Sequence, residues 1–364
     1  TSILSNNGWY HTKTEQSQLL DRSHIIHQDG MTLTGDTIYY DKANEYGRCI
    51  GHIESVDSAN QMTLFGNRGE VWENGHRAYV TDSAMMLEWS DTTDLTYMHA
   101  DSLWAEEIPF TTYSLIERDS ILVDSVMTAQ MPDTIWRDTT YQQLRAFHNV
   151  RIFRSDMQAV CDSARYHGKD SILTLFGLPI CWNEDNQLSA DQIDVYIKNQ
   201  EVDYMHGVGN AIAIKREGIE EFNQLAGKEM FAYVRDRDIY LVDVQGNAET
   251  VFYPQEDDGT YIGVNRTQSS FVKLYLKDRK IDYVLFTTAT TGVMIPLDQA
   301  LENERKLSGF FWAEEERPHS PEDIFSHPPR TVRPVAGTVS AAAEDEEETE
   351  ENEEENKATR RQNR

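Results

Sequence analysis

The stretch TLTGDTIYY, residues 32–40, decides the fold, because similar stretches return along most of the chain. Each clear copy places a small residue before Asp or Asn inside a short apolar run. The copies are TLFGNRGEV (63–71), YMHADSLWA (97–105), QAVCDSARY (158–166) and QLSADQIDV (187–195), with weaker ones at QLAGKEMFA (224–232) and YIGVNRTQS (261–269). The small residues Gly35, Gly66, Ala100, Cys161, Ala190, Gly227 and Gly263 recur about every 30 residues, apart from one longer interval.

A second repeated pattern lies between these copies: a strand, a small or turn residue, and another strand. It is found at RCIGHIESV (48–56), AYVTDSAMML (78–87), AFHNVRIFR (146–154), LTLFGLPICW (173–182), HGVGNAIAIK (206–215) and DVQGNAETVF (243–252). The opening residues 8–27 resemble the second half of a truncated unit. The sequence therefore predicts about seven stacked units of two strands each, none able to bury its apolar face alone.

The composition excludes several classes of protein. Hydrophobic residues make up 39% of the 364 positions and charged residues 26%, which is enough to build a core. No run approaches the roughly 20 apolar residues of a membrane helix. The formal charge of −29 argues against nucleic acid as a partner, because phosphate neutralisation requires a basic face.

The organisation along the chain follows from the repeats and from shifts in composition. We assign strand repeats to residues 1–104, an insertion to 105–139, further repeats to 140–295, and a helix with a capping segment to 296–330. Within that last segment, PLDQALENERKLSGFFW (296–312) predicts one helix, with Pro near its start and Gly near its end. Residues 331–364 are strongly acidic at their end and predict a disordered tail.

No pattern indicates catalysis. The Asp-Ser and Asp-Thr pairs, such as Asp36-Thr37 and Asp162-Ser163, recur in successive units, so we interpret them as elements of the fold that cap turns or bridge strands. The histidines form no metal-binding motif, and no phosphate-binding loop occurs. Cys49, Cys161 and Cys181 predict buried free thiols, with a Cys161–Cys181 bridge as the alternative in an oxidising compartment. The sequence predicts a protein that is not an enzyme and uses no cofactor or metal.

The ordered set of repeats resembles the OstA-like (LptA-like) family of the lipopolysaccharide-transport system, in its Bacteroidota form. The resemblance covers about residues 8–326. It rests on the repeated units and on four short segments: Tyr10–Thr14, Gln158–Ser163, Gly309–Trp312, and Arg317-Pro318 followed by Asp323–Phe325. The resemblance implies an all-β, repeat-built open β-jellyroll, or β-taco, of about 14 antiparallel strands, with a short C-terminal helix.

The same resemblance implies a function. We expect a periplasmic lipid-binding bridge that shields the acyl chains of lipopolysaccharide in an apolar groove between two sheets and meets other transport components by pairing of edge strands. Alternation along the strands gives the residues expected to line this groove: Leu33, Ile38, Leu64, Leu87, Met98, Leu103, Phe147, Ile152, Leu173, Leu175, Ile212, Ile214, Leu274 and Leu276. The alternative is a structural scaffold or adhesin-like repeat protein whose interior is filled by its own side chains.

The two ends of the stack are expected to differ. LLDRSHII, residues 19–26, predicts an unpaired edge strand. It carries only one acidic and one basic residue and no proline, and so lacks the usual protection of an edge. At the other end, the helix and the GFFW block (309–312) are expected to fold over the last strand, IDYVLFTT (281–288), and to cap it.

Overall fold

The computed structural model describes residues 2–26, 30–89, 94–116, 121–123, 126–128, 133–256, 258–326 and 328. Over these residues the chain is all-β, as predicted, and its strands form one large sheet and one small hairpin. The expected acidic tail, 331–364, lies outside the described residues. Within the described part of the chain, no helix is long and apolar enough to cross a membrane.

The strands of the large sheet run from the N-terminus to residue 296. They are β1 (Ser2–Leu4), β2 (Asn7–His11), β3 (Gln16–Leu20), β4 (Ser23–Ile26), β5 (Thr32–Gly35), β6 (Thr37–Asp41), β7 (Tyr46–Asp57), β8 (Met62–Trp72), β9 (Arg77–Thr81), β10 (Met85–Glu88), β11 (Thr96–His99), β12 (Ser102–Ile116), β15 (Asp133–Phe153), β16 (Gln158–His167), β17 (Ile172–Phe176), β18 (Ile180–Asn183), β19 (Asn186–Ser189), β20 (Gln192–Lys198), β21 (Glu201–Arg216), β22 (Phe222–Arg235), β23 (Asp238–Phe252), β24 (Gly263–Lys277), β25 (Lys280–Thr287) and β26 (Thr291–Pro296).

The remaining elements are short. β13 (Ile121–Val123) and β14 (Val126–Thr128) pair with each other, and the 3-10 turn η1 (Glu73–Gly75) joins β8 to β9. After β26 come the helix α1 (Glu302–Arg305) and the 3-10 turns η2 (Glu314–Glu316) and η3 (Pro321–Phe325).

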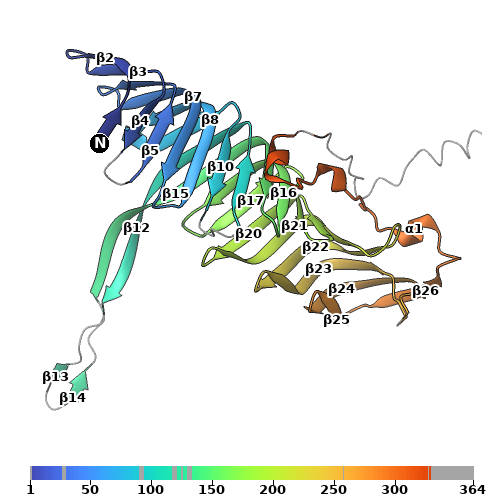
Figure 1. Ribbon diagram of the computed structural model, residues 1–364. Helices are drawn as coiled ribbons and strands as arrows, with labels where there is room; N and C mark the ends of the chain where they lie inside the picture. Colours follow the sequence, from blue (N-terminus) through green and yellow to red (C-terminus); the bar gives the residue numbers. More distant parts are fainter. Residues whose placement is uncertain are drawn as a thin grey trace, which may run out of the picture.

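The 24-stranded sheet is an antiparallel meander of sixteen bent strands, each paired with its neighbours in sequence. Eight bent strands are unbroken, as in β7 and β8. The other eight are interrupted at the bend and carry two labels, as in β5–β6 and β9–β10. All bends lie along one line, so the whole sheet is folded lengthwise into two facing arms (Figure 1).

The bends arise from the repeated small and polar residues. In alternate strands two consecutive residues adopt positive φ, as in Gly51-His52 (81° and 43°) and Gly209-Asn210 (73° and 45°), where Gly and Asn carry little steric penalty. The register shifts there, because the bent strand holds one residue more than its partner. Such a β-bulge kinks a strand and increases its twist.

The recurrent aspartates bridge neighbouring strands across the bend. Asp36 Oδ2 lies 2.6 Å from His52 Nδ1, and Asn210 Nδ2 donates to Asp191 Oδ2 at 2.9 Å. Asn149 Nδ2 donates to both carboxylate oxygens of Asp101 at 3.1 Å. The hydrogen bond from His52 holds the pKa of Asp36 below its ordinary value. The interpretation of these aspartates as fold elements is therefore confirmed.

We name the two arms by their attachments. The ribbon arm contains β2, β3, β6, β9, β12, β17, β20 and β25. From this arm the ends of β12 and β15 continue as a two-stranded ribbon that projects away from the body (Figure 1). The segment predicted as an insertion, 105–139, makes up most of this ribbon. The strap arm contains β1, β4, β5, β10, β11, β18, β19 and β26. Residues 297–326, the strap, run back across its outer face.

Two buried glutamines hold the strap. Gln187 Nε2 donates to the carbonyl oxygen of Phe311, and its Oε1 accepts from the backbone N–H of Ala313, both at 2.9 Å. Gln224 repeats the arrangement with the carbonyl of Arg305 at 2.8 Å and the N–H of Leu307 at 2.7 Å. Each side-chain amide thus bonds to a C=O and an N–H of the strap backbone, as the backbone of a neighbouring strand would.

Apolar contacts and an arginine complete the attachment of the strap. Phe311 and Ala313 pack on Val160, Ile180 and Trp182, and Leu307 packs on a cluster that includes Ile212 and Ile214. Nearer the end of the strap, the guanidinium of Arg151 donates to the carbonyl oxygens of Glu316 (2.9 Å) and Asp323 (3.2 Å). The strap is therefore a third layer over part of the strap arm.

Four expectations for the ends of the chain are wrong. Residues 2–26 form two complete bent strands, not a truncated unit, which raises the number from about 14 to sixteen. The N-terminal edge is accordingly β1–β2, whereas residues 19–26 are paired on both sides. The helix expected over 296–312 is only α1, because the strap backbone bonds to the glutamines. The strap leaves β25–β26 uncapped, with β24 as their partner.

The bend at Gly35 gives a first prediction. A Cβ added at Gly35 would overlap Sγ of Cys49, which lies against the bend. Gly35→Ala is therefore expected to lower the free energy of unfolding by about 1–3 kcal/mol through overpacking. Combining it with Cys49→Ala should recover part of this loss, and denaturant unfolding of both single variants and the double variant measures the coupling. Strict additivity of the two changes would contradict the proposed overlap.

Candidate functional site: the apolar interior and its N-terminal mouth

The inner faces of the two arms meet in a continuous apolar interior. Each bent strand contributes one residue to a ladder along the strap arm, defined by direct cross-strand pairing. Its first members are Ile3, Ile25, Leu33, Ser55, Leu64, Met86, Met98 and Ile152, followed by Ala159, Cys181, Leu188, Ala213, Leu225, Thr250, Thr267 and Gly292.

A second ladder runs along the inner face of the ribbon arm. It comprises Gly8, Leu19, Ile38, Cys49, Gly69, Val80, Leu103, Ala146, Ala164, Leu175, Ile193, Gly207, Met230, Val244, Val272 and Phe286. From Val80 to Val272, members of both ladders belong to one buried cluster that spans the arms. The two inner faces therefore pack against each other.

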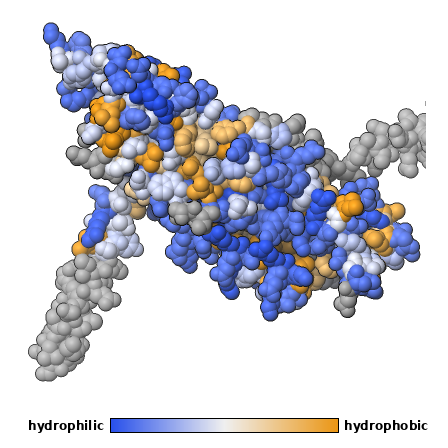
Figure 2. All heavy atoms as spheres, in the orientation of Figure 1, coloured by the Kyte–Doolittle hydropathy of each residue, from blue (hydrophilic) through white to orange (hydrophobic). Residues whose placement is uncertain are grey.

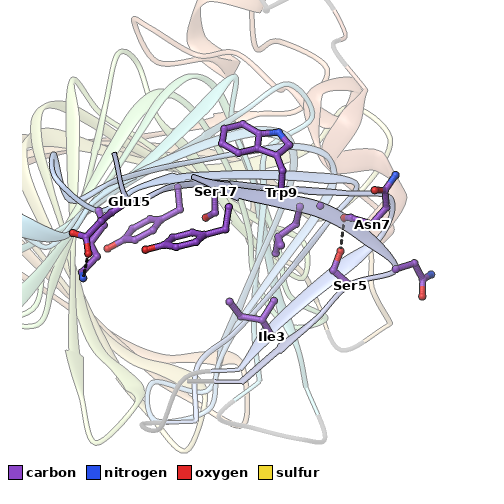
Figure 3. A pocket seen from close by; sticks show the side chains of 12 residues that line it. Ile3, Ser5, Asn7, Trp9, Glu15 and Ser17 are labelled. Atoms are coloured by element: carbon purple, nitrogen blue, oxygen red, sulfur yellow. Dashed lines mark hydrogen bonds and ion pairs between the residues drawn. The ribbon is translucent and has the colours of Figure 1, made fainter. Parts of the chain in front are cut away.

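The interior opens into a cavity at its N-terminal end. This mouth has a volume of about 580 Å³ and is lined by Ile3, Ser5, Asn6, Asn7, Gly8, Trp9, Tyr10, Glu15, Ser17, Leu19, Tyr40 and Lys42. Figure 3 shows Ile3 reaching into the hollow from the strap arm, opposite β3 with Ser17 and the turn before it with Glu15, whereas the indole of Trp9 points away from the hollow. All of these residues come from the first three bent strands and the turns beside them.

The polar groups at the mouth largely satisfy one another. Lys42 Nζ lies 2.9 Å from Glu15 Oε1, and this hydrogen bond raises the pKa of the Lys42 ammonium. The hydroxyl of Tyr40 donates a hydrogen bond to the Glu73 carboxylate at 2.9 Å. Desolvation is the larger cause and this hydrogen bond the smaller one of a rise in the pKa of Tyr40 to about 12. Ser5 donates to the carbonyl oxygen of Asn7 at 2.8 Å. What remains on the cavity wall is chiefly apolar and aromatic surface.

A plug of buried side chains closes the inner end of the mouth. Ile38, Cys49 and Ile53 are 3–4% exposed and form their own cluster, with Leu19 and Leu33 packed against it. Burial raises the pKa of the Cys49 thiol to about 11, which is consistent with an apolar environment. Further along, the interior is filled by the protein's own side chains, of which Leu175, Ile193, Met230, Val244 and Val272 are at most 1% exposed.

Ten of the residues predicted to line a groove lie on the inner faces. Met98, Leu103 and Leu175 are buried in the large cluster, and Leu64, Ile152, Leu173, Leu274 and Leu276 pack against it half-buried. Leu33 and Ile38 belong to the plug or pack on it. These ten residues thus line a largely filled interior, and none of them lines the mouth cavity itself.

The other four lie on the opposite face. Leu87 and Phe147 neighbour Met86 and Ala146, which belong to the inner ladders, so alternation directs them outward. Ile212 and Ile214 are covered on the outer face by the strap residue Leu307, while Ala213 between them faces inward. The prediction failed there because the strap makes the outer face apolar as well, and the larger residues were assigned to the wrong side.

Interpreting the opening segment as a truncated unit leaves the mouth residues unpredicted. The signal was present: Leu19 and Ser17 alternate with Gln18 and Gln16, and Tyr40 follows Ile38 at a spacing of two. Continuing the alternation into residues 2–20 would have placed Ile3, Tyr10 and Leu19 on the inner face.

Other kinds of site find little support among the described residues. No group of three or more His, Cys, Asp or Glu side chains in that part of the chain is arranged to hold a metal ion. All three cysteines are buried as thiols, so the bridge between Cys161 and Cys181 is absent. A smaller hollow of about 380 Å³ at the bend, lined by Thr81, Asp82, Ser83, His99, Asp101 and Phe325, is mainly polar.

Fold and site together define an all-β protein whose folded meander encloses an apolar interior open at one end. A solved structure similar to this chain is that of LptH, the LptA-homologous periplasmic component of the lipopolysaccharide transport device of Pseudomonas aeruginosa. The TM-score is 0.31 and the identity 14%, over 39% of this chain and 99% of that one. No family model and no curated protein matches the sequence.

Proposed function

We propose that the protein is a non-enzymatic lipid-binding component of periplasmic lipopolysaccharide transport that holds acyl chains between the two arms. The observation that carries the proposal is the N-terminal mouth, a cavity of about 580 Å³ between apolar ladders. Burial of an acyl chain in such a space gains about 0.8 kcal/mol per methylene. The OstA-like resemblance of the repeats supplies the expectation of lipopolysaccharide as cargo.

The free edges suit a bridging role. β1–β2 at one end and β25–β26 at the other each pair on one side within the described chain. Leu4 at the first edge and Val293 and Met294 at the second are 49–61% exposed. Uncovered edges of this kind accept a strand from another protein. We therefore propose that other transport components join here by strand pairing.

A matched pair of neighbouring tyrosines tests lipid binding. Tyr40 lines the mouth, whereas Tyr39, one residue earlier in β6, faces the other side of the sheet. With a photo-crosslinking benzoyl-phenylalanine at position 40, irradiation in the presence of lipopolysaccharide is expected to attach lipid to the protein, and with the same residue at position 39 it is not. Mass spectrometry of the irradiated protein detects the adduct. Equal labelling at the two positions would refute binding in the mouth.

The scaffold alternative is favoured by one observation, the self-filled interior beyond the plug. There Met230, Val244 and Val272 occupy the space between the arms and are fully buried. In a purely structural protein the mouth would be only the unfilled end of the stack. Absence of labelling at both position 39 and position 40 is the outcome this alternative expects.

A further inference from the structure

The mouth is blind, and this limits what it can hold. Its lining comes from the first three bent strands, which at about 4.8 Å per strand span about 14 Å. At the inner end of these strands, Ile38 of β6 and Cys49 of β7 belong to one cluster with Ile53 from the strap-arm half of β7, and all three are nearly fully buried. A ligand entering from the N-terminal end therefore meets a packed wall before it reaches the large interior cluster.

The chemistry of the wall selects an apolar ligand. The backbones of the lining strands pair with one another, and the polar side chains Lys42, Tyr40 and Ser5 already have partners within the protein. A polar ligand would have to break these interactions to gain its own. A hydrocarbon chain needs no such partner and gains from removing Leu19, Ile3 and the aromatic rings from water.

We propose that the mouth is a blind pocket for the terminal part of one saturated acyl chain, with its depth set by the plug of Ile38, Cys49 and Ile53. This inference rests on the proposed function and adds to it the class of ligand and a limit on chain length. The polar head of the ligand stays outside, beyond the rim formed by Glu15 and Lys42. A lipid with several acyl chains would insert one of them and leave the others to the surface or to a partner.

A series of fatty acids of increasing length tests the depth. The full chain is titrated with octanoate, decanoate, laurate, myristate, palmitate and stearate, each displacing a fluorescent fatty acid. The affinity is expected to rise about fourfold for each added methylene until the pocket is full, and then to remain constant. An affinity that keeps rising through stearate would overturn the blind pocket while leaving lipid binding intact. If none of the acids binds, the proposed function fails with it.

Two variants test the plug and the lining of the mouth separately. Ile53→Ala removes part of the plug and should move the plateau to longer chains; Ile50→Ala, an exposed isoleucine on the other face of the same strand, should leave it in place. Because Ile53→Ala also weakens the core, Ser17→Leu provides a second test at a half-buried position. It fills the mouth and should move the plateau to shorter chains. A plateau that neither Ile53→Ala nor Ser17→Leu moves would place the binding elsewhere.

Discussion

Trp182→Ala is expected to lower the free energy of unfolding by about 3–5 kcal/mol, the cost of removing a large aromatic side chain from a packed site. Trp182 is 1% exposed and lies between the sheet and the strap, in contact with Val160, Ile180, Phe311 and Ala313. The alanine variant would leave a cavity under the strap, and thermal or denaturant unfolding measures the loss.

Two companion variants make this prediction specific. Trp136 on the projecting ribbon is 65% exposed, so Trp136→Ala should change stability by about 0.5 kcal/mol or less. The indole Nε1 of Trp182 has no hydrogen-bond partner among the described residues, so Trp182→Phe keeps most of the packing and removes an unsatisfied donor. It should cost less than about 1.5 kcal/mol. A phenylalanine variant as unstable as the alanine variant would contradict the cavity as the cause.

The second large effect is expected from Gln187→Ala, at one of the two glutamines that hold the strap. The change removes the hydrogen-bond donor to the carbonyl of Phe311 and the acceptor for the N–H of Ala313, and losing a partner at a buried polar group costs about 1–3 kcal/mol. The strap should then loosen locally, and the free energy of unfolding of the whole protein should fall as well. Hydrogen exchange of the Ala313 amide and limited proteolysis within 305–318 report the loosening.

An exposed glutamine on the same sheet serves as control. Gln268 lies on the outer face of β24, and Gln268→Ala should leave both the exchange rate and the free energy of unfolding nearly unchanged. Gln187→Glu keeps an acceptor for Ala313 but loses the donor to Phe311 and places a charge in a buried site. It should be at least as destabilising as alanine. If strap exchange in the Gln187 variants matches the unaltered protein, the glutamine attachment is not what holds the strap.

The repeated small residues predicted the bends well, because bending depends on local backbone chemistry. Gly35, Gly66, Ala100, Ala190 and Gly227 all lie at the fold line. The last anchor, Gly263, begins β24 instead, and the bend of that strand falls near Ser269, where two serines carry no distinctive pattern. The regular period was therefore sufficient for the architecture and failed only in its weakest copy.

The partition between inner and outer faces was harder to predict. Alternation assigns residues to two faces but does not tell which face packs against the other arm and which against the strap. Both faces of the strap arm are apolar. Ile212 and Ile214 lie under the strap, whereas the smaller Ala211 and Ala213 face the narrow interior. The strap contacts sheet residues that precede it in the sequence by up to about 170 positions. A local sequence pattern does not predict a contact over that separation.

The unbroken sequence order of the meander has a consequence for how the chain acquires its structure during synthesis. Every bent strand finds its partner in the segment made just before it, so the sheet is able to grow in the order of translation with small loop-closure costs. The strap alone reaches back, from residue 323 to Arg151, and it is the last described segment to emerge. Its attachment is therefore the last step in building the described structure. A chain interrupted before residue 297 leaves Trp182 and Ile214 without their cover, and exposed apolar surface of this kind favours aggregation.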